Sequence, residues 1–124
     1  MAINPATRAR FREHKGKRIY VTDGSGLGHD DILKLADKCA EDIRAQPLGS
    51  VLAVIHAKDA ILDWRIMEKM RWLADGNRPH VKAAAVSGLA PVHRMILKTV
   101  SIVTRRDFLV FETLEEALDA LAKL

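Results

Sequence analysis

The period of the apolar residues switches repeatedly between strand and helix, and this alternation constrains the fold of the chain more than any other feature. Segments with the pattern and length of strands occupy residues 8–14, 18–23, 50–55, 80–88 and 107–111. Apolar residues at helical spacing occupy residues 29–45, 63–76, 90–104 and 113–124. The first two runs flank a glycine turn, "KGK", which predicts a hairpin. The predicted order is therefore β-β-α-β-α-β-α-β-α.

This order predicts an α/β fold with a mixed, mostly parallel five-stranded sheet. Continuous apolar strands that alternate with helices are typical of parallel strands buried on both faces. The hairpin places one antiparallel strand at an edge, and four helices cover the sheet. Two helix termini carry specific signals: Asp63 and Thr113 precede helices as N-caps, with Glu116 completing a capping box after Thr113. Gly76 is expected to be a C-cap.

The length of the chain predicts one domain. The 124 residues, 48% of them apolar, suffice for a single core spanning 1–124, with residues 1–6 expected to form a flexible N-terminus. No apolar run reaches the ~20 residues of a membrane span, and we expect a cytoplasmic protein. The single cysteine, Cys39, aligns with the apolar face of its helix and is expected to be a core residue. No Cys/His spacing indicates a metal, and no cofactor is expected.

The net charge of +4 is concentrated at the N-terminus, where residues 1–18 carry six Arg and Lys against one Glu. A basic arm can attract nucleic acid or an anionic membrane surface. However, Arg8, Arg10 and Arg12 alternate with Ala and Phe, which is typical of a solvated edge strand protected from pairing with other chains. No aromatic platform or base-reading motif accompanies the arm, and we expect no specific nucleic acid partner.

Three segments, together with the order of elements, resemble a known family. The segments "EHKGKRIYVTD", "GNRPHVKAAAVSGL" and "FETLEEALDAL" are similar to those of the small bacterial SpoIIAA-like proteins, a branch of the STAS superfamily that is also compared with CRAL-TRIO lipid-binding domains. The resemblance covers roughly residues 7–122 and implies a STAS-like fold. Arg105 and Ala120 depart from the pattern, replacing a frequent Gly and a frequent Trp.

The stretch "DGSGLG", residues 23–28, resembles the turn that carries a phosphorylated serine in anti-sigma factor antagonists of the STAS superfamily. In those proteins the turn follows the third strand, whereas here it follows the second. Counted by elements, the corresponding loop is residues 56–63, which contain no Ser or Thr. Phosphorylation of Ser25 is therefore disfavoured. A phosphate cradle is also disfavoured, because Asp30 and Asp31 would place negative charge where the phosphate must sit.

Candidate catalytic residues are sparse. The five histidines are scattered over different connections and lack metalloprotease spacing. A Ser-His-Asp arrangement of Ser87, His56 and Asp59 can be drawn from the topology, but Ser87 lacks the nucleophile-elbow motif. We therefore expect no catalytic residues and no enzyme, with a small hydrolase as a remote alternative.

The expected binding surface lies on the loops at the carboxyl ends of the parallel strands, residues 56–64 and 87–91, where ligands meet folds of this kind. Trp64 points away from the apolar stripe of its helix, so that it either contacts a partner or folds back over the loop. Trp72, by contrast, is expected at the edge of the core. The predicted partner-binding residues are His56, Lys58, Asp59, Asp63, Trp64, Ser87 and Gly88.

The sequence thus favours a non-enzymatic STAS-like protein-interaction domain with another protein as its partner. The alternative is a carrier of an apolar or lipid-like ligand, suggested by the CRAL-TRIO comparison and by the very apolar helix expected at residues 91–104. A homo-oligomer is compatible with either hypothesis.

Overall fold

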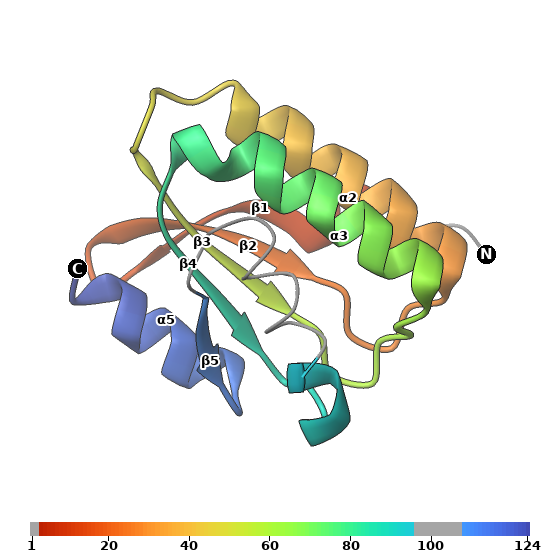
Figure 1. Cartoon of the computed structure of the whole chain (residues 1–124). Coiled ribbons are helices and arrows are strands. Elements are labelled where there is room, and N and C mark those ends of the chain that lie inside the picture. Colours follow the sequence, from red (N-terminus) through yellow and green to blue (C-terminus); the bar gives the residue numbers. More distant parts are fainter. Residues whose placement is uncertain (1–2, 96–107) are drawn as a thin grey trace.

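The structure, a computed structural model, describes residues 3–95 and 108–124 and contains the predicted mixed sheet (Figure 1). The strands run in the spatial order β1-β2-β3-β4-β5. β1 pairs with β2 in antiparallel orientation, and the remaining neighbours are parallel. Their bounds are Ala9–His14, Lys17–Asp23, Val51–His56, Val81–Ser87 and Leu109–Phe111.

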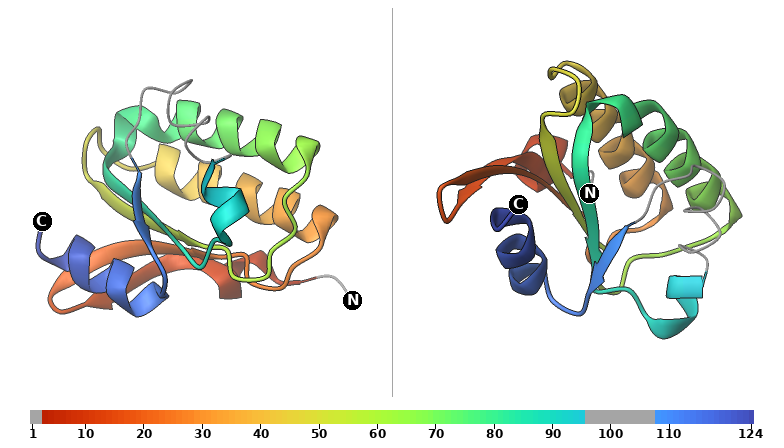
Figure 2. Two further views of the ribbon diagram at one scale, coloured as in Figure 1. Left: turned by 60° about the horizontal axis from the view of Figure 1, so that its bottom comes forward. Right: turned by 60° about the vertical axis from the view of Figure 1, so that its left-hand side comes forward.

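Helices cover both faces of the sheet. α2 (His29–Arg44) and α3 (Trp64–Asn77) lie side by side on one face, and α5 (Leu114–Ala122) lies on the other (Figures 1 and 2). Side chains alternate along β2 accordingly: Tyr20 packs in the core under α2 and α3, whereas Ile19 and Val21 pack in the core under α5. Cys39 is 2% exposed in the first of these cores, as predicted.

Two short helical segments were not expected. α1 (Pro5–Arg8) begins inside the segment predicted to be a flexible N-terminus, and the Asn4 side chain accepts a hydrogen bond from the Ala6 amide at 3.1 Å. The 3-10 helix η1 (Arg78–His80) follows α3 directly. Residues 91–95 are helical, and the rest of the helix predicted at 90–104 lies outside the described residues.

The predicted helix caps are confirmed at both N-termini. Asp63 accepts a hydrogen bond from the Ile66 amide at 2.9 Å, and Thr113 accepts one from the Glu116 amide at 3.2 Å. The prediction for Gly76 was wrong. α3 continues through Asn77, and a β-carbon on Gly76 would lie 2.1 Å from Nη2 of Arg44. Gly76 is therefore a packing residue that leaves room for the Arg44 guanidinium.

Of the described helices, none is long and apolar enough to cross a bilayer.

Candidate partner surface

The loops after β2, β3 and β4 meet at the carboxyl end of the sheet (Figure 1). The Gly24 amide donates to the carbonyl of His56 at 2.8 Å, and the Gly26 amide donates to that of Lys58 at 2.9 Å. The Ala57 amide donates to the carbonyl of Ser87 at 2.8 Å. Loop 56–64, which the sequence singled out, is thus held by hydrogen bonds from both neighbouring connections.

A side-chain contact reinforces this junction. Asp23, His56 and Ser87 lie side by side in register at the ends of their strands. Nδ1 of His56 lies 2.7 Å from Oγ of Ser87, and Ser87 is completely buried. Among the described residues, no carboxylate forms an ion pair with His56, so Asp59 does not complete a triad. The contact between His56 and Ser87 therefore attaches the start of loop 56–64 to the end of β4.

Gly88 lets the β4 loop approach the β3 loop closely. Its φ is +80°, and a β-carbon there would lie 2.9 Å from the Lys58 amide nitrogen and 3.0 Å from Cε1 of His56. Asp59 also has a positive φ, 55°, on the neighbouring turn. The side chains of Ser87 and His56 and the backbone of Gly88 therefore fix the shape of loop 56–64.

Two large apolar side chains of loop 56–64 are exposed to solvent. Trp64 is 66% exposed on the first turn of α3, and Ile61 is 45% exposed. This exposure confirms that Trp64 points away from the apolar stripe and excludes the reading in which its ring folds back over the loop. Asp63 caps α3 with one oxygen, while its other oxygen lies 3.7 Å from Nε2 of His29.

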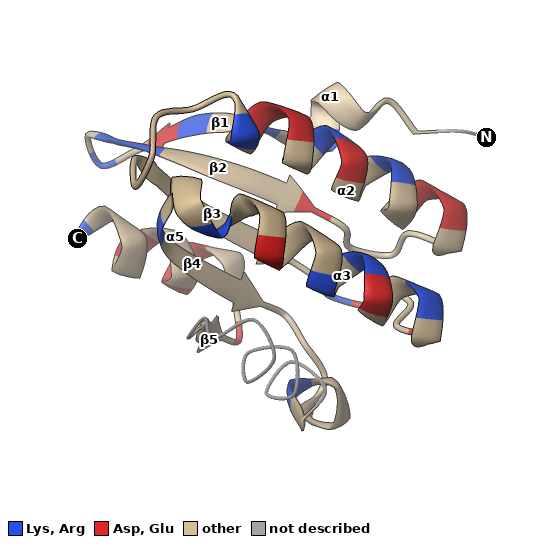
Figure 3. Ribbon diagram, turned by 45° about the horizontal axis from the view of Figure 1, so that its top comes forward, with Lys and Arg blue, Asp and Glu red and all other residues tan. Residues whose placement is uncertain are grey.

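Charge of both signs surrounds Trp64. The N-terminal ends of α2 and α3 lie side by side, with acidic residues at the start of α2 and a basic residue at the start of α3 (Figure 3). These are Asp30 and Asp31 on α2 and Arg65 on α3. An exposed aromatic ring within a mixed polar rim is a typical arrangement of protein contact surfaces.

Trp72, the second tryptophan of α3, has a different environment. Its ring is 44% exposed at the edge of the core. The Arg44 guanidinium lies 4.3 Å from the centre of the ring and the Lys69 ammonium lies 4.0 Å from it. The Trp72 ring thus contacts cations of its own chain, whereas no ring or cation contact of Trp64 is found among the described residues.

The "DGSGLG" turn is ordered by its own side chains. Oδ1 of Asp23 accepts hydrogen bonds from the amide and the hydroxyl of Ser25, at 3.0 and 2.6 Å. The Ser25 carbonyl accepts a hydrogen bond from Arg8 at 2.9 Å, and Gly26 adopts a φ of +68°. These contacts support the interpretation that the turn is a structural connector. The turn follows β2, the second strand, as expected from the sequence. The role of Arg8 was missed, because no local pattern links it to a turn 17 residues away.

One cluster outside the loops brings together metal-ligating side chains. His14, Glu115 and Asp119 place a ligand atom each within 4.8 Å of one another. The ammonium of Lys15 lies 2.8 Å from Asp119, and its hydrogen bond lowers the pKa of that carboxyl. Lys15 therefore already supplies the positive charge at this cluster, and we assign no metal to it.

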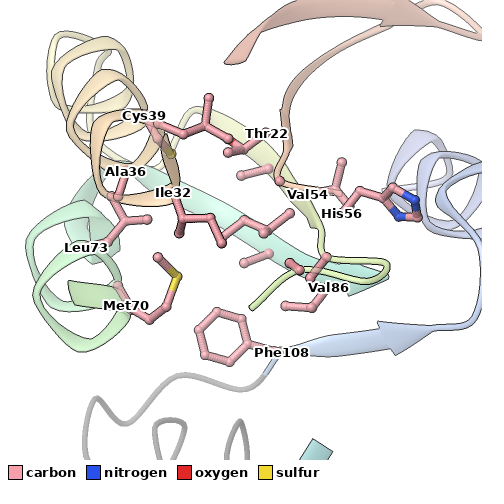
Figure 4. A pocket seen from close by; sticks show the side chains of 18 of the residues that line it. Thr22, Ile32, Ala36, Cys39, Val54, His56, Met70, Leu73, Val86 and Phe108 are labelled. Atoms are coloured by element: carbon pink, nitrogen blue, oxygen red, sulfur yellow. The ribbon is translucent and has the colours of Figure 1, made fainter. Parts of the chain in front are cut away.

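An apolar cavity of about 150 Å³ lies between the sheet and helices α2 and α3 (Figure 4). Its wall includes side chains from β2, α2, α3 and β4, and Phe108 contributes a ring before β5. The ring of His56 points away from it. Sequence reasoning missed the cavity, because the space left between apolar side chains depends on how the elements pack. The labelled wall residues are Thr22, Ile32, Ala36, Cys39, Val54, His56, Met70, Leu73, Val86 and Phe108.

Comparisons with known proteins identify the fold. A solved structure, that of an anti-sigma-factor antagonist (STAS) domain protein from Planctomyces limnophilus, matches with a TM-score of 0.63 over 92% of this chain and 97% of that chain. The fold is STAS-like. The two sequences are 12% identical, so the likeness is one of architecture. No protein-family model matches the chain, and no curated protein sequence matches it.

Proposed function

We propose that this chain is a non-enzymatic, regulatory protein-interaction domain that binds another protein through loop 56–64. The observation that carries the proposal is Trp64, a large aromatic residue that is 66% exposed although it lies on a well-capped helix. Truncation of aromatic anchors of this kind gives the largest losses in protein interfaces. The matched solved structure, described as an anti-sigma-factor antagonist domain, supports a partner of the protein class.

The rigidity of the loop favours binding. Its backbone is tied to the 24–28 turn and to Ser87 by hydrogen bonds, so little conformational entropy remains to be lost when a partner docks. Ile61 extends the apolar centre around Trp64, and Lys58, Asp59 and Asp63 supply a polar rim. Ser87 is buried, and it therefore supports the surface through His56 and does not contact the partner itself.

The same geometry argues against hydrolysis. A nucleophilic serine has to reach the substrate, and Ser87 has no exposed surface. The His56 ring that contacts it has no orienting carboxylate among its described hydrogen bonds. We therefore propose a binding function and no enzymatic activity. The resemblance to small bacterial STAS-like proteins supports the separate proposal that the chain works in the cytoplasm of a bacterium.

A second candidate function rests on the cavity. A space of about 150 Å³ among apolar side chains can hold a small apolar molecule, as expected for a carrier. Residues Ala57, Ala60, Ile61 and Leu62 of loop 56–64 also line this cavity, so the two candidate sites adjoin each other.

Native mass spectrometry of the protein purified from its host distinguishes the two functions. We expect a co-purified protein that is lost in Trp64→Ala and retained in Trp72→Ala, a matched control on the same helix. A retained small apolar molecule without a partner protein would favour the carrier. A co-purified protein held equally by both variants would contradict the proposed surface.

A further inference from the structure

Negative charge predominates around Trp64, although the chain as a whole carries a net charge of +4. The Trp64 surface comprises residues 29–31 at the start of α2, which is acidic (Figure 3), and residues 58–65. With His29 neutral its net charge is −2, from the aspartates Asp30, Asp31, Asp59 and Asp63 and the cations Lys58 and Arg65. A docking partner therefore meets a charge opposite in sign to that of the whole chain.

The aspartates of this surface are not neutralised by cations of the described residues. The Asp30 side chain is 93% exposed, and its one ion-pair contact is with Nδ1 of His29 at 3.4 Å. Asp63 caps α3 with one oxygen, and its other oxygen lies 3.7 Å from Nε2 of His29. Among the described residues, no Lys or Arg forms an ion pair with any of the four aspartates. Further along α2, by contrast, Asp37 and Asp42 each pair with a lysine.

Helix formation accounts for only part of this charge. Asp30, Asp31 and Asp63 lie where the start of a helix favours a carboxylate. Asp59 is exposed in the loop, five positions before α3, and its positive φ of 55° would be accepted equally by Asn or Gly. The negative charge thus extends from the helix ends into the loop on which Trp64 is exposed.

Charge of this sign restricts the partners that can cover the exposed apolar side chains. A protein with an acidic rim would bring like charges together, and the phosphates of nucleic acid or of a membrane surface would meet the same repulsion. We propose that the partner is a protein segment with an apolar centre flanked by lysine or arginine residues. This inference rests on the proposed function and adds to it the chemistry of the partner. The apolar centre covers Trp64 and Ile61, and the flanking cations pair with Asp30 and Asp59.

Two synthetic amphipathic peptides with the same leucine positions are the probes. One peptide carries lysine at its polar positions and the other carries glutamate. Each is titrated into the ¹⁵N-labelled protein, and ¹H–¹⁵N NMR shows which amides respond. The charge of +4 on the whole chain favours the glutamate peptide, whereas the Trp64 surface favours the lysine peptide, so the two predict opposite preferences.

A pair of double variants isolates the carboxylates of the surface. Asp30→Asn with Asp59→Asn removes two negative charges, and Asn tolerates the positive φ at position 59. Glu41→Gln with Asp75→Asn removes two exposed negative charges further along α2 and α3 and is the matched control. Both double variants change the net charge of the chain equally.

We expect the lysine peptide to shift the amide signals of residues 58–65 and to bind more tightly than the glutamate peptide. Its dissociation constant should rise about fivefold in the Asp30, Asp59 double variant, because two exposed ion pairs are lost, and stay within about twofold in the control. Added salt should weaken its binding.

Equal binding of both peptides, a preference for glutamate, or no shift at residues 58–65 would overturn the basic partner. The proposed function would survive these results if a co-purified protein were still lost in Trp64→Ala. Retention of that protein in Trp64→Ala would overturn the proposed function itself, and the inference with it.

Discussion

The two tryptophans of α3 show how much the surroundings of a residue decide its role. The Trp72 ring contacts the cations of Arg44 and Lys69, whereas Trp64 presents 66% of its surface to solvent. The helical period of the sequence predicts that both lie off the central stripe, and the structure confirms this. The Arg44 contact of Trp72 could not be predicted, because Arg44 comes from another helix, whereas Lys69 lies three positions before Trp72 on α3.

Trp64→Ala is expected to change the free energy of unfolding by less than about 0.5 kcal/mol, as is usual for exposed positions. Trp72→Ala should cost about 1–2 kcal/mol, because it removes contacts with the cations of Arg44 and Lys69. Urea unfolding of both variants checks the contrast. A loss of about 3 kcal/mol in Trp64→Ala, the range for emptying a buried aromatic site, would show that the ring belongs to the core.

The Tyr20 hydroxyl predicts a dependence of stability on pH. It donates a hydrogen bond to Asp42 at 2.6 Å. Burial acts to raise the pKa of Asp42, but the hydrogen bonds from Lys38 and Tyr20 outweigh it and lower the pKa. A carboxyl whose pKa is lowered on folding adds stability above its unfolded pKa, and this stability disappears as the pH falls through the folded value.

Tyr20→Phe should therefore cost about 1 kcal/mol or more at neutral pH. Because the variant moves the pKa of Asp42 back toward its ordinary value, the gap from wild type should shrink as the pH falls below about 4. Denaturant unfolding at several pH values measures the gap. A difference in unfolding free energy that stays constant with pH would show that the stability contributed by the Tyr20 hydroxyl does not depend on Asp42.

At the scale of elements, hydrophobic periodicity located every described strand and the helices α2, α3 and α5, with ends shifted by a few residues. The caps at Asp63 and Thr113 were predictable because they depend on residues three positions apart. Gly76 was misread, because its role depends on Arg44, 32 positions earlier. The topology placed loops 56–64 and 87–91 at one edge, but their hydrogen bonds to the 24–28 turn were not foreseen.

A double-mutant cycle tests this account of Gly76. Through the higher helix propensity of alanine, Gly76→Ala should raise the free energy of unfolding by about 1 kcal/mol. With Arg44 present, displacement of the Arg44 guanidinium by the new β-carbon offsets this gain. In an Arg44→Ala background the full gain should emerge. Denaturant unfolding of the four proteins measures the coupling. Equal gains in both backgrounds would contradict the packing role assigned to Gly76.

At the scale of the whole molecule, the exposed arginines of the N-terminal segment lie on the edge strand β1 and not on the Trp64 loop. Arg10 and Arg12 are exposed on β1, and Arg8 instead contacts the 24–28 turn. The double variant Arg10→Gln, Arg12→Gln should lower solubility and leave partner binding unchanged, because charged edges prevent association between sheets. Salt-dependent binding of DNA or anionic vesicles by the wild type, lost in the double variant, would instead make the edge strand a functional contact.

The affinity of the co-purified partner for wild type, Trp64→Ala and Trp72→Ala tests the central claim most directly. If loop 56–64 is the partner surface, Trp64→Ala should weaken binding by about 2 kcal/mol, roughly thirtyfold, and Trp72→Ala should bind within about threefold of wild type. Because Trp64→Ala is expected to be as stable as wild type, such a loss reports on the interface alone. Equal affinity of wild type and Trp64→Ala for that partner would contradict the account.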